Sequence, residues 1–126
     1  MTEQNETKHS MIVTIVSKGY ADLTVAAAKE AGARFCTMLY ARGSGVHETE
    51  KFLNISIEPE KEIVLTFVRS ADVKGIVSSI TDKVGLATAG AGVTFVLPIT
   101  RTAGVTAEAQ DEAAAGTAPD EEGRGG

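Results

Sequence analysis

The sequence predicts an α+β domain of the ferredoxin-like type, in which a four-stranded antiparallel sheet carries two helices on one face and the elements follow the order βαββαβ. Two observations predict this fold. Four apolar segments with the composition of strands occur between residues 11 and 99, and a segment with helical spacing follows the first and the third of them. The length of 126 residues is that of one domain.

The first half of the domain is predicted to hold two strands and one helix. The residues of Met11–Ser17 are β-branched and almost continuously apolar, which indicates a strand buried on both faces. Ala21–Ala31 is rich in alanine and indicates a helix, which Gly32 ends. Alternation across Arg34–Ala41 indicates a second strand. Its two faces hold Phe35, Thr37, Leu39 and Ala41 on one side and Cys36, Met38 and Tyr40 on the other.

The second half is predicted to hold the remaining elements. Glu62–Val68 indicates a third strand. Ala71–Asp82 has a clear apolar face at helical spacing and indicates a second helix, with Ser70 as its N-cap. Val93–Ile99 indicates a fourth strand, which Pro98 places at a strand end or at a sheet edge because proline donates no ladder hydrogen bond.

Charge and composition predict the organisation of the chain. The net charge of −5 resides in residues 103–126, because residues 1–102 carry 11 basic and 11 acidic side chains. We expect a flexible segment at 1–10, a domain at 11–102 and a disordered acidic tail at 103–126. The neutral body has no run of lysine and arginine, which argues against nucleic acid as a partner. A single cysteine and the lack of a long apolar segment favour a soluble cytoplasmic protein without membrane insertion.

The predicted sheet leaves one apolar face without helices. A monomer would then expose a larger hydrophobic patch than soluble monomers usually tolerate. We therefore expect homo-oligomerisation through sheet faces or edges.

Two glycine-rich loops are the candidate binding elements. Arg42-Gly43-Ser44-Gly45 follows the second strand, and Thr88-Ala89-Gly90-Ala91-Gly92 precedes the fourth. Glycine permits positive φ and lets backbone N–H groups approach an anion closely, so the loops are able to cradle phosphate or carboxylate oxygens. The alternative is that both are simply tight strand exits.

These two motifs resemble those of the P-II nitrogen-regulatory superfamily over about residues 11–104. The resemblance lies in Thr37 with the Gly43-Ser44-Gly45 loop and in the stretch from Gly90 to Pro98. It implies a homotrimer that binds an adenine nucleotide (ATP, ADP or AMP) or another anionic metabolite in clefts between subunits, without a required cofactor. It also implies a regulator of nitrogen or carbon utilisation, not an enzyme, whose loop at 44–56 controls a transporter or a metabolic enzyme.

The resemblance also implies roles for individual residues. Thr37 matches the position that contacts adenine, Gly43 and Gly45 flank the base of the loop, and His47 falls where the family has a glutamine beside the phosphates. Gly90 and Gly92 match the glycines that cradle phosphate, and Arg101 matches an arginine that reaches phosphate from the neighbouring subunit. The complete expected ligand set is Thr37, Arg42, Gly43, Ser44, Gly45, His47, Gly90, Ala91, Gly92 and Arg101.

The sequence departs from the family pattern in the number of cations at this site. Val93 stands where the family has a lysine, and a second C-terminal arginine is missing. Each lost charge-assisted hydrogen bond costs about 1.5 to 3 kcal/mol of binding free energy. The sequence therefore predicts weakened binding of ATP.

The connection at Ser44–Ser56 has no sustained period, which predicts an exposed and mobile loop. It is shorter than the usual P-II loop. Phe52 and Leu53 are its apolar residues, and they either anchor a partner, together with Glu48 and Lys51, or pack into the trimer.

Several other polar residues have both a functional and a structural reading. Arg42 either pairs with an anionic ligand or is a solvated strand end. His47 either gates the site by protonation or is an ordinary polar loop residue, and the His47-Glu48-x-Glu50 spacing lacks a second nitrogen or sulfur ligand, so no metal is expected. Three carboxylates alternate along the strand, those of Glu58, Glu60 and Glu62. Paired carboxylates are able to do acid–base chemistry, but a solvated face of the strand explains these three better.

Two other function classes remain open at this stage. A purely structural trimer would keep the fold without a ligand, and the absence of lysine at Val93 favours it modestly. A small ferredoxin-like enzyme would need a convincing carboxylate or thiol cluster, and Ser44 lacks the surroundings of a nucleophile.

Overall fold

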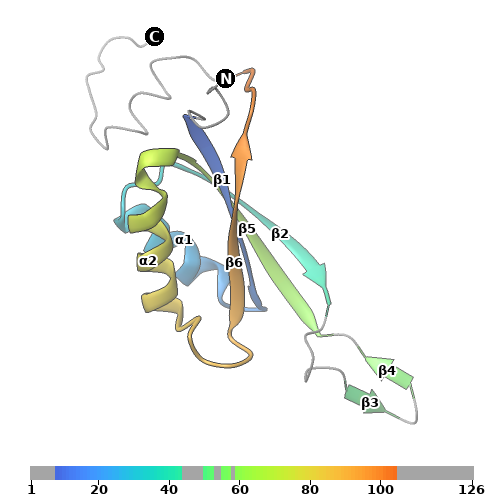
Figure 1. The fold of residues 1–126 in the computed structure, drawn as a ribbon. Coiled ribbons are helices and arrows are strands. Elements are labelled where there is room, and N and C mark those ends of the chain that lie inside the picture. The colour runs from blue at the N-terminus through green and yellow to red at the C-terminus, as the bar shows by residue number, and fades with distance from the viewer. Residues whose placement is uncertain (1–7, 44–49, 53–54, 58, 105–126) are drawn as a thin grey trace.

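The computed structural model describes residues 8–43, 50–52, 55–57 and 59–104 (Figure 1). Along the chain the elements are β1 (His9–Ser17), α1 (Ala21–Glu30), β2 (Phe35–Arg42), β3 (Glu50–Phe52), β4 (Ile55–Ile57), β5 (Glu60–Arg69), the short 3-10 helix η2 (Ser70–Asp72), α2 (Val73–Val84) and β6 (Gly92–Ile99).

The main sheet has the strand order β2-β5-β1-β6, and every neighbouring pair in it is antiparallel. Both helices lie on one face of this sheet (Figure 1). The predicted ferredoxin-like architecture is therefore confirmed. β2 and β6 are the two edge strands, so Pro98 lies in an edge strand as predicted.

The core forms between the helices and the even-numbered residues of β1 and β5. Ile12 and Val16 of β1 and Val68 of β5 pack in one cluster with Ile76 and Ile80 of α2. Ala27 and Ala28 bring α1 into the same cluster. Small alanine side chains let the helix lie close to the sheet.

The prediction that the first strand is buried on both faces is wrong for this chain. Buried and partly buried residues alternate along β1, because the helices cover only one side. The opposite side, which we call the open face, is formed by odd-numbered residues of all four strands. Its large apolar members are Met11, Val13, Ile15, Phe35, Leu39, Ile63, Leu65, Phe67, Val93, Phe95, Leu97 and Ile99. An uncovered apolar face agrees with the expectation from sequence.

The first helix begins at Ala21 as predicted and ends one residue early, at Glu30. Its N-cap residue, Tyr20, offers no side-chain hydrogen bond. The Glu62 carboxylate of β5 accepts instead, from the N–H groups of Gly19 (3.0 Å) and Ala21 (2.9 Å). After the helix, Gly32 has φ of +111°, which explains why a glycine ends it.

The second helix differs from its prediction at both ends. Residues 70–72 form η2, and α2 runs from Val73 to Val84. Ser70 is not an N-cap, because its hydroxyl pairs with that of Ser10 at 2.7 Å. The helix continues two residues beyond Asp82 and stops at Gly85, whose φ of +80° suits a left-handed C-cap.

The predicted irregular connection at Ser44–Ser56 contains two short strands. β3 and β4 pair antiparallel, with Glu50 opposite Ile57 and Phe52 opposite Ile55, and form a separate two-stranded sheet (Figure 1). The Gly43 N–H donates to the Pro59 carbonyl oxygen at 3.1 Å and closes the base of this segment. A three-residue strand is too short for alternation to reveal it in the sequence.

The strand boundaries correct the predicted ends of the domain. β1 begins at His9, inside the segment 1–10 that was predicted to be flexible, and β5 is three residues longer than predicted. The tail at 103–126 was predicted to be disordered. Residues 105–126 of this tail lie outside the described residues. Within the part of the chain that the structure describes, no helix is long and apolar enough to span a membrane.

Candidate functional site

The two glycine loops lie at the same end of the main sheet, which we call the loop end. β2 ends there at Arg42, opposite Glu60, and β6 begins there at Gly92, opposite Val16 of β1. The loops stand on opposite edges, with β5 and β1 between them. Three strand spacings separate edge from edge, about 14 Å. A ligand that contacts both loops of one protomer must therefore cross the ends of β5 and β1.

Arg42, at the first glycine loop, lies in a charged cluster on the helix side of the sheet. It is the register partner of Glu60, whose carboxylate pairs with the Lys18 ammonium at 2.9 Å. The hydrogen bond and charge of Lys18, followed by the charge of Arg42, lower the pKa of Glu60, and the same contact raises the pKa of Lys18. Arg42 therefore faces a carboxylate in the protomer, which reduces the charge that it offers to an anion.

The second glycine loop connects α2 to β6 through two tight turns. The Thr88 N–H donates to the Gly85 carbonyl oxygen at 2.9 Å, and the Ala91 N–H donates to that of Thr88 at 3.1 Å. Gly90 has φ of +83° and open space around it. Gly92 is different, because a Cβ atom at this position would lie 2.5 Å from the Ile15 carbonyl oxygen.

Glycine is therefore required at positions 90 and 92 for different reasons. Positive φ alone favours glycine at position 90, whereas contact with the β1 backbone excludes a side chain at position 92. The glycine at 92 is explained by strand packing without any ligand, whereas Gly90 and the backbone around it face open space.

Thr37 and Arg101 lie away from both loops. Thr37 is on the open face in the middle of β2, opposite Leu65, and is exposed. Arg101 follows the far end of β6, which spans eight residues, or about 24 Å of strand. One protomer does not bring the expected ligand set together, and Arg101 can join a glycine loop only if a neighbouring subunit supplies it.

Lys61 is a further cation at the loop end that sequence analysis did not include in the site. Strand alternation puts it on the open face, between Ala41 of β2 and Ser17 of β1, and it is 9 % exposed. It lies on the path between the two glycine loops. The sequence offers only the odd-numbered position of Lys61 in β5 as a sign that it belongs to the open face. That sign can be used only when the register of the strands is known.

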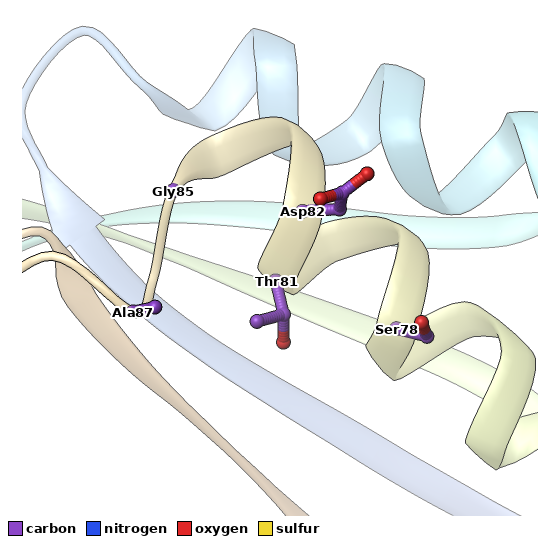
Figure 2. Close-up of a pocket in the computed structure, with 5 residues that line it drawn as sticks. All are labelled: Ser78, Thr81, Asp82, Gly85 and Ala87. Atoms are coloured by element: carbon purple, nitrogen blue, oxygen red, sulfur yellow. The ribbon is translucent and has the colours of Figure 1, made fainter.

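A separate open hollow of about 460 Å³ lies at the end of α2 (Figure 2). Its lining residues belong to the last turns of this helix and to the following turn: Ser78, Thr81, Asp82, Gly85 and Ala87. None of the expected ligand residues lines it. The hollow is therefore not the predicted site.

Several expected site residues fall outside the described part of the chain. These are Ser44, Gly45, His47, Glu48 and Leu53. Lys51 and Phe52 belong to β3, whose backbone alone is described. Among the described residues, no group of three or more His, Cys, Asp and Glu side chains is placed to hold a metal ion.

Comparison with known families finds one match that covers most of the chain. The model of the nitrogen regulatory protein P-II family matches residues 9–109, which include the whole main sheet, both helices and both glycine loops. A search of curated proteins finds no match. The fold and the match agree, and the chain belongs to the P-II nitrogen regulatory protein family, whose members are regulatory proteins of signal transduction.

Proposed function

We propose that this protein is a homotrimeric P-II signalling protein that binds an adenine nucleotide or another small anionic metabolite between its subunits. Binding alters the segment at 44–56, and that segment controls a transporter or an enzyme of nitrogen or carbon utilisation. The observation that carries the proposal is the family match over residues 9–109.

The uncovered apolar surfaces support assembly. The open face includes Phe95 and Leu97, which are 43 % and 48 % exposed in the isolated chain, and both edge strands carry exposed apolar residues. Soluble monomers rarely leave such a surface in water. Apolar edge strands also offer unpaired backbone groups to another chain. A second and a third copy of the chain would bury the apolar surface and pair the backbone groups of the edge strands.

The positions of the expected ligand residues support a site between subunits. The glycine loops and Lys61 lie at the loop end, and Arg101 lies beyond the opposite end of β6. A site that uses all of them needs Arg101 from a neighbour. The arrangement requires a head-to-tail contact, and such contacts form a closed ring when the rotation between subunits closes, as it does in a trimer with threefold symmetry.

The charges support an effector with fewer negative charges than ATP. Val93, on the open face opposite Ile15, gives no cation where the family has a lysine. Arg42 is already beside Glu60. Arg42, whose charge Glu60 partly offsets, and the neighbour's Arg101 are the expected cations of the site, which suits one phosphate or carboxylate better than a triphosphate.

A calorimetric titration of the full-length protein with ATP, ADP and AMP tests this function. We expect saturable binding, with AMP or ADP tighter than ATP. Arg101→Ala should weaken binding about tenfold or more, because it removes a charge-assisted hydrogen bond. Lys29→Ala is the matched control, since it removes an exposed cation from α1, and it should leave the affinity unchanged. Lack of binding by all three nucleotides would contradict the proposed nucleotide effector.

A ligand-independent structural trimer is the second candidate, and one observation favours it. Gly92 is explained by its contact with the Ile15 carbonyl oxygen, so the second motif is partly a packing motif. This candidate predicts an oligomer of normal stability that gives no heat and no thermal shift with any of the three nucleotides.

A further inference from the structure

His9 lies on the open face, at the end of the sheet opposite the loop end, where β1 begins and β5 ends (Figure 1). Its ring stacks on the ring of Phe67, with 5.0 Å between the ring centroids and 12° between the ring planes. Phe35 of β2 packs edge-on against Phe67, with 6.0 Å between the centroids. The half-buried imidazole is therefore part of the aromatic surface of the open face.

The open face carries few ionisable side chains. Among the strand residues that the structure describes, those on this face are His9, Lys61 and Arg69, and no carboxylate lies on it. Lys61 is eight residues from Arg69 along β5, or about 26 Å away. A positive charge on His9 would thus find no counter-ion on the described part of the face.

The charged groups around His9 are mainly cations. On β5 its register partner is Arg69, whose guanidinium already pairs with the Asp72 carboxylate at 3.4 Å. β6 ends opposite His9, and the first charged residue after it is Arg101. Lys8, which precedes His9, is exposed. Proton uptake by His9 therefore adds a charge to a neighbourhood that is already positive among the described residues.

A second copy of the chain suits the open face. Interfaces between identical subunits are more apolar than other interfaces, and large apolar side chains from all four strands form this face. The face also lacks a pattern of charges that would specify a different partner. Copies that meet through it would cover His9 together with Phe67.

Covering the open face changes the cost of a charge at position 9. In a separate subunit water solvates an imidazolium, and its attraction to the Phe67 ring is the same with or without a second copy. Under a second copy the charge loses water and gains no carboxylate, because the open face of that copy has none to offer. A neutral imidazole is covered at a much lower cost. Separate subunits therefore bind protons more readily than the assembly does.

We propose that His9 makes the assembly of this protein pH-sensitive: subunits associate through the open face while His9 is neutral and separate in mild acid. The inference rests on the proposed homotrimer, because the other two copies are what cover the face. Histidine is the side chain that usually changes charge between about pH 5 and 8. Each subunit contributes one His9, so the proton dependence adds up over the oligomer.

Sedimentation equilibrium of the full-length protein without ligand tests the proposal. The protein is measured over a range of concentrations at about pH 8 and about pH 5.5, and circular dichroism checks that it stays folded. The concentration at which half of the oligomer dissociates should be about tenfold or more higher at the lower pH.

Variants at position 9 make the test specific. His9→Phe should assemble equally well at both pH values, because phenylalanine still stacks on Phe67 and takes up no proton. His9→Arg is always charged and should assemble weakly at both. His47→Gln is the matched control, because His47 is the other histidine of the chain, and this variant should keep the pH dependence of the wild type.

The outcomes separate this inference from the proposed homotrimer. Equal dissociation of the wild-type protein at both pH values would overturn the role of His9 and leave the oligomer standing. A pH dependence that survives in His9→Phe would overturn that role as well. A monomer at both pH values would contradict the homotrimer itself, and the inference would fail with it.

Discussion

The Glu62 carboxylate oxygen of β5 lies 2.9 Å from the backbone nitrogen of Ala21, the first residue of α1. It also accepts from the Gly19 N–H, so one side chain satisfies two N–H groups at the start of the helix. Two residues earlier, Glu60 pairs with Lys18. The turn between β1 and α1 is thus tied at two points to the strand that follows the segment 44–58.

Removing this distant helix cap should destabilise the domain. Glu62→Ala leaves two helix-end N–H groups without their acceptor, and we expect the free energy of unfolding to fall by about 1 to 2 kcal/mol. Chemical denaturation measures it. Glu60→Gln is the matched control at the same end, and the loss of its exposed ion pair should lower the free energy of unfolding clearly less. Equal effects of the two variants would contradict the capping role.

The two glycines of the second loop should respond differently to alanine. Gly90→Ala strains a positive φ in open space and should cost about 1 kcal/mol of unfolding free energy. Gly92→Ala adds a methyl group 2.5 Å from a backbone oxygen, so the loss should be clearly larger. Thermal unfolding of both variants without ligand shows which of them loses more stability. If both variants were as stable as the wild type, the packing explanation of Gly92 would be wrong.

The Lys18–Glu60 pair should make a small, pH-dependent contribution to stability. The pKa of Glu60 is lowered in the folded protein, so its contribution is present above the ordinary glutamate value and is lost as the pH falls through the lowered one. The melting temperature of Glu60→Gln should therefore approach that of the wild type in acid. The raised pKa of Lys18 predicts a second convergence at alkaline pH. A difference that grows in acid would contradict this assignment.

Cys36 should react slowly with alkylating reagents. Burial, opposed by its contact with the Thr66 hydroxyl, raises the pKa of the thiol and keeps it protonated at neutral pH. Because the thiolate is the nucleophile, iodoacetamide should modify the folded protein more slowly than the unfolded chain. Equal rates in the presence and absence of denaturant would show that the thiol is not protected.

The elements of the fold were predictable because their signals are local. Alternation along β2 and helical spacing along α2 identify both elements, and Gly32 and Pro98 stand where the structure needs them. The predictions were wrong where a residue's role depends on a partner far away in the sequence. Ser70 fits a helix cap by composition, but Ser10 takes its hydroxyl, and no local pattern assigns Glu62 to a helix forty residues earlier.

The candidate site was less predictable than the fold for the same reason. Sequence spacing indicates the two glycine loops, but their position on opposite sheet edges follows from strand order. The position of Lys61 between β2 and β1 became visible only when the register placed distant residues together. Thr37 and Arg101 lie away from both loops within one chain, and only the register and the direction of β6 reveal this.

The most direct test of the account is nucleotide binding by mixed oligomers of two variants, Arg42→Ala and Arg101→Ala. Each variant alone should bind the adenine nucleotide of the wild-type protein weakly, because every site lacks one cation. After the subunits of the two variants are exchanged in equal amounts, a site between subunits that takes one residue from each should be restored in about one quarter of cases. Titration calorimetry should then recover tight binding with that stoichiometry. If mixing the two variants does not restore tight binding, the site is not completed by the neighbouring subunit.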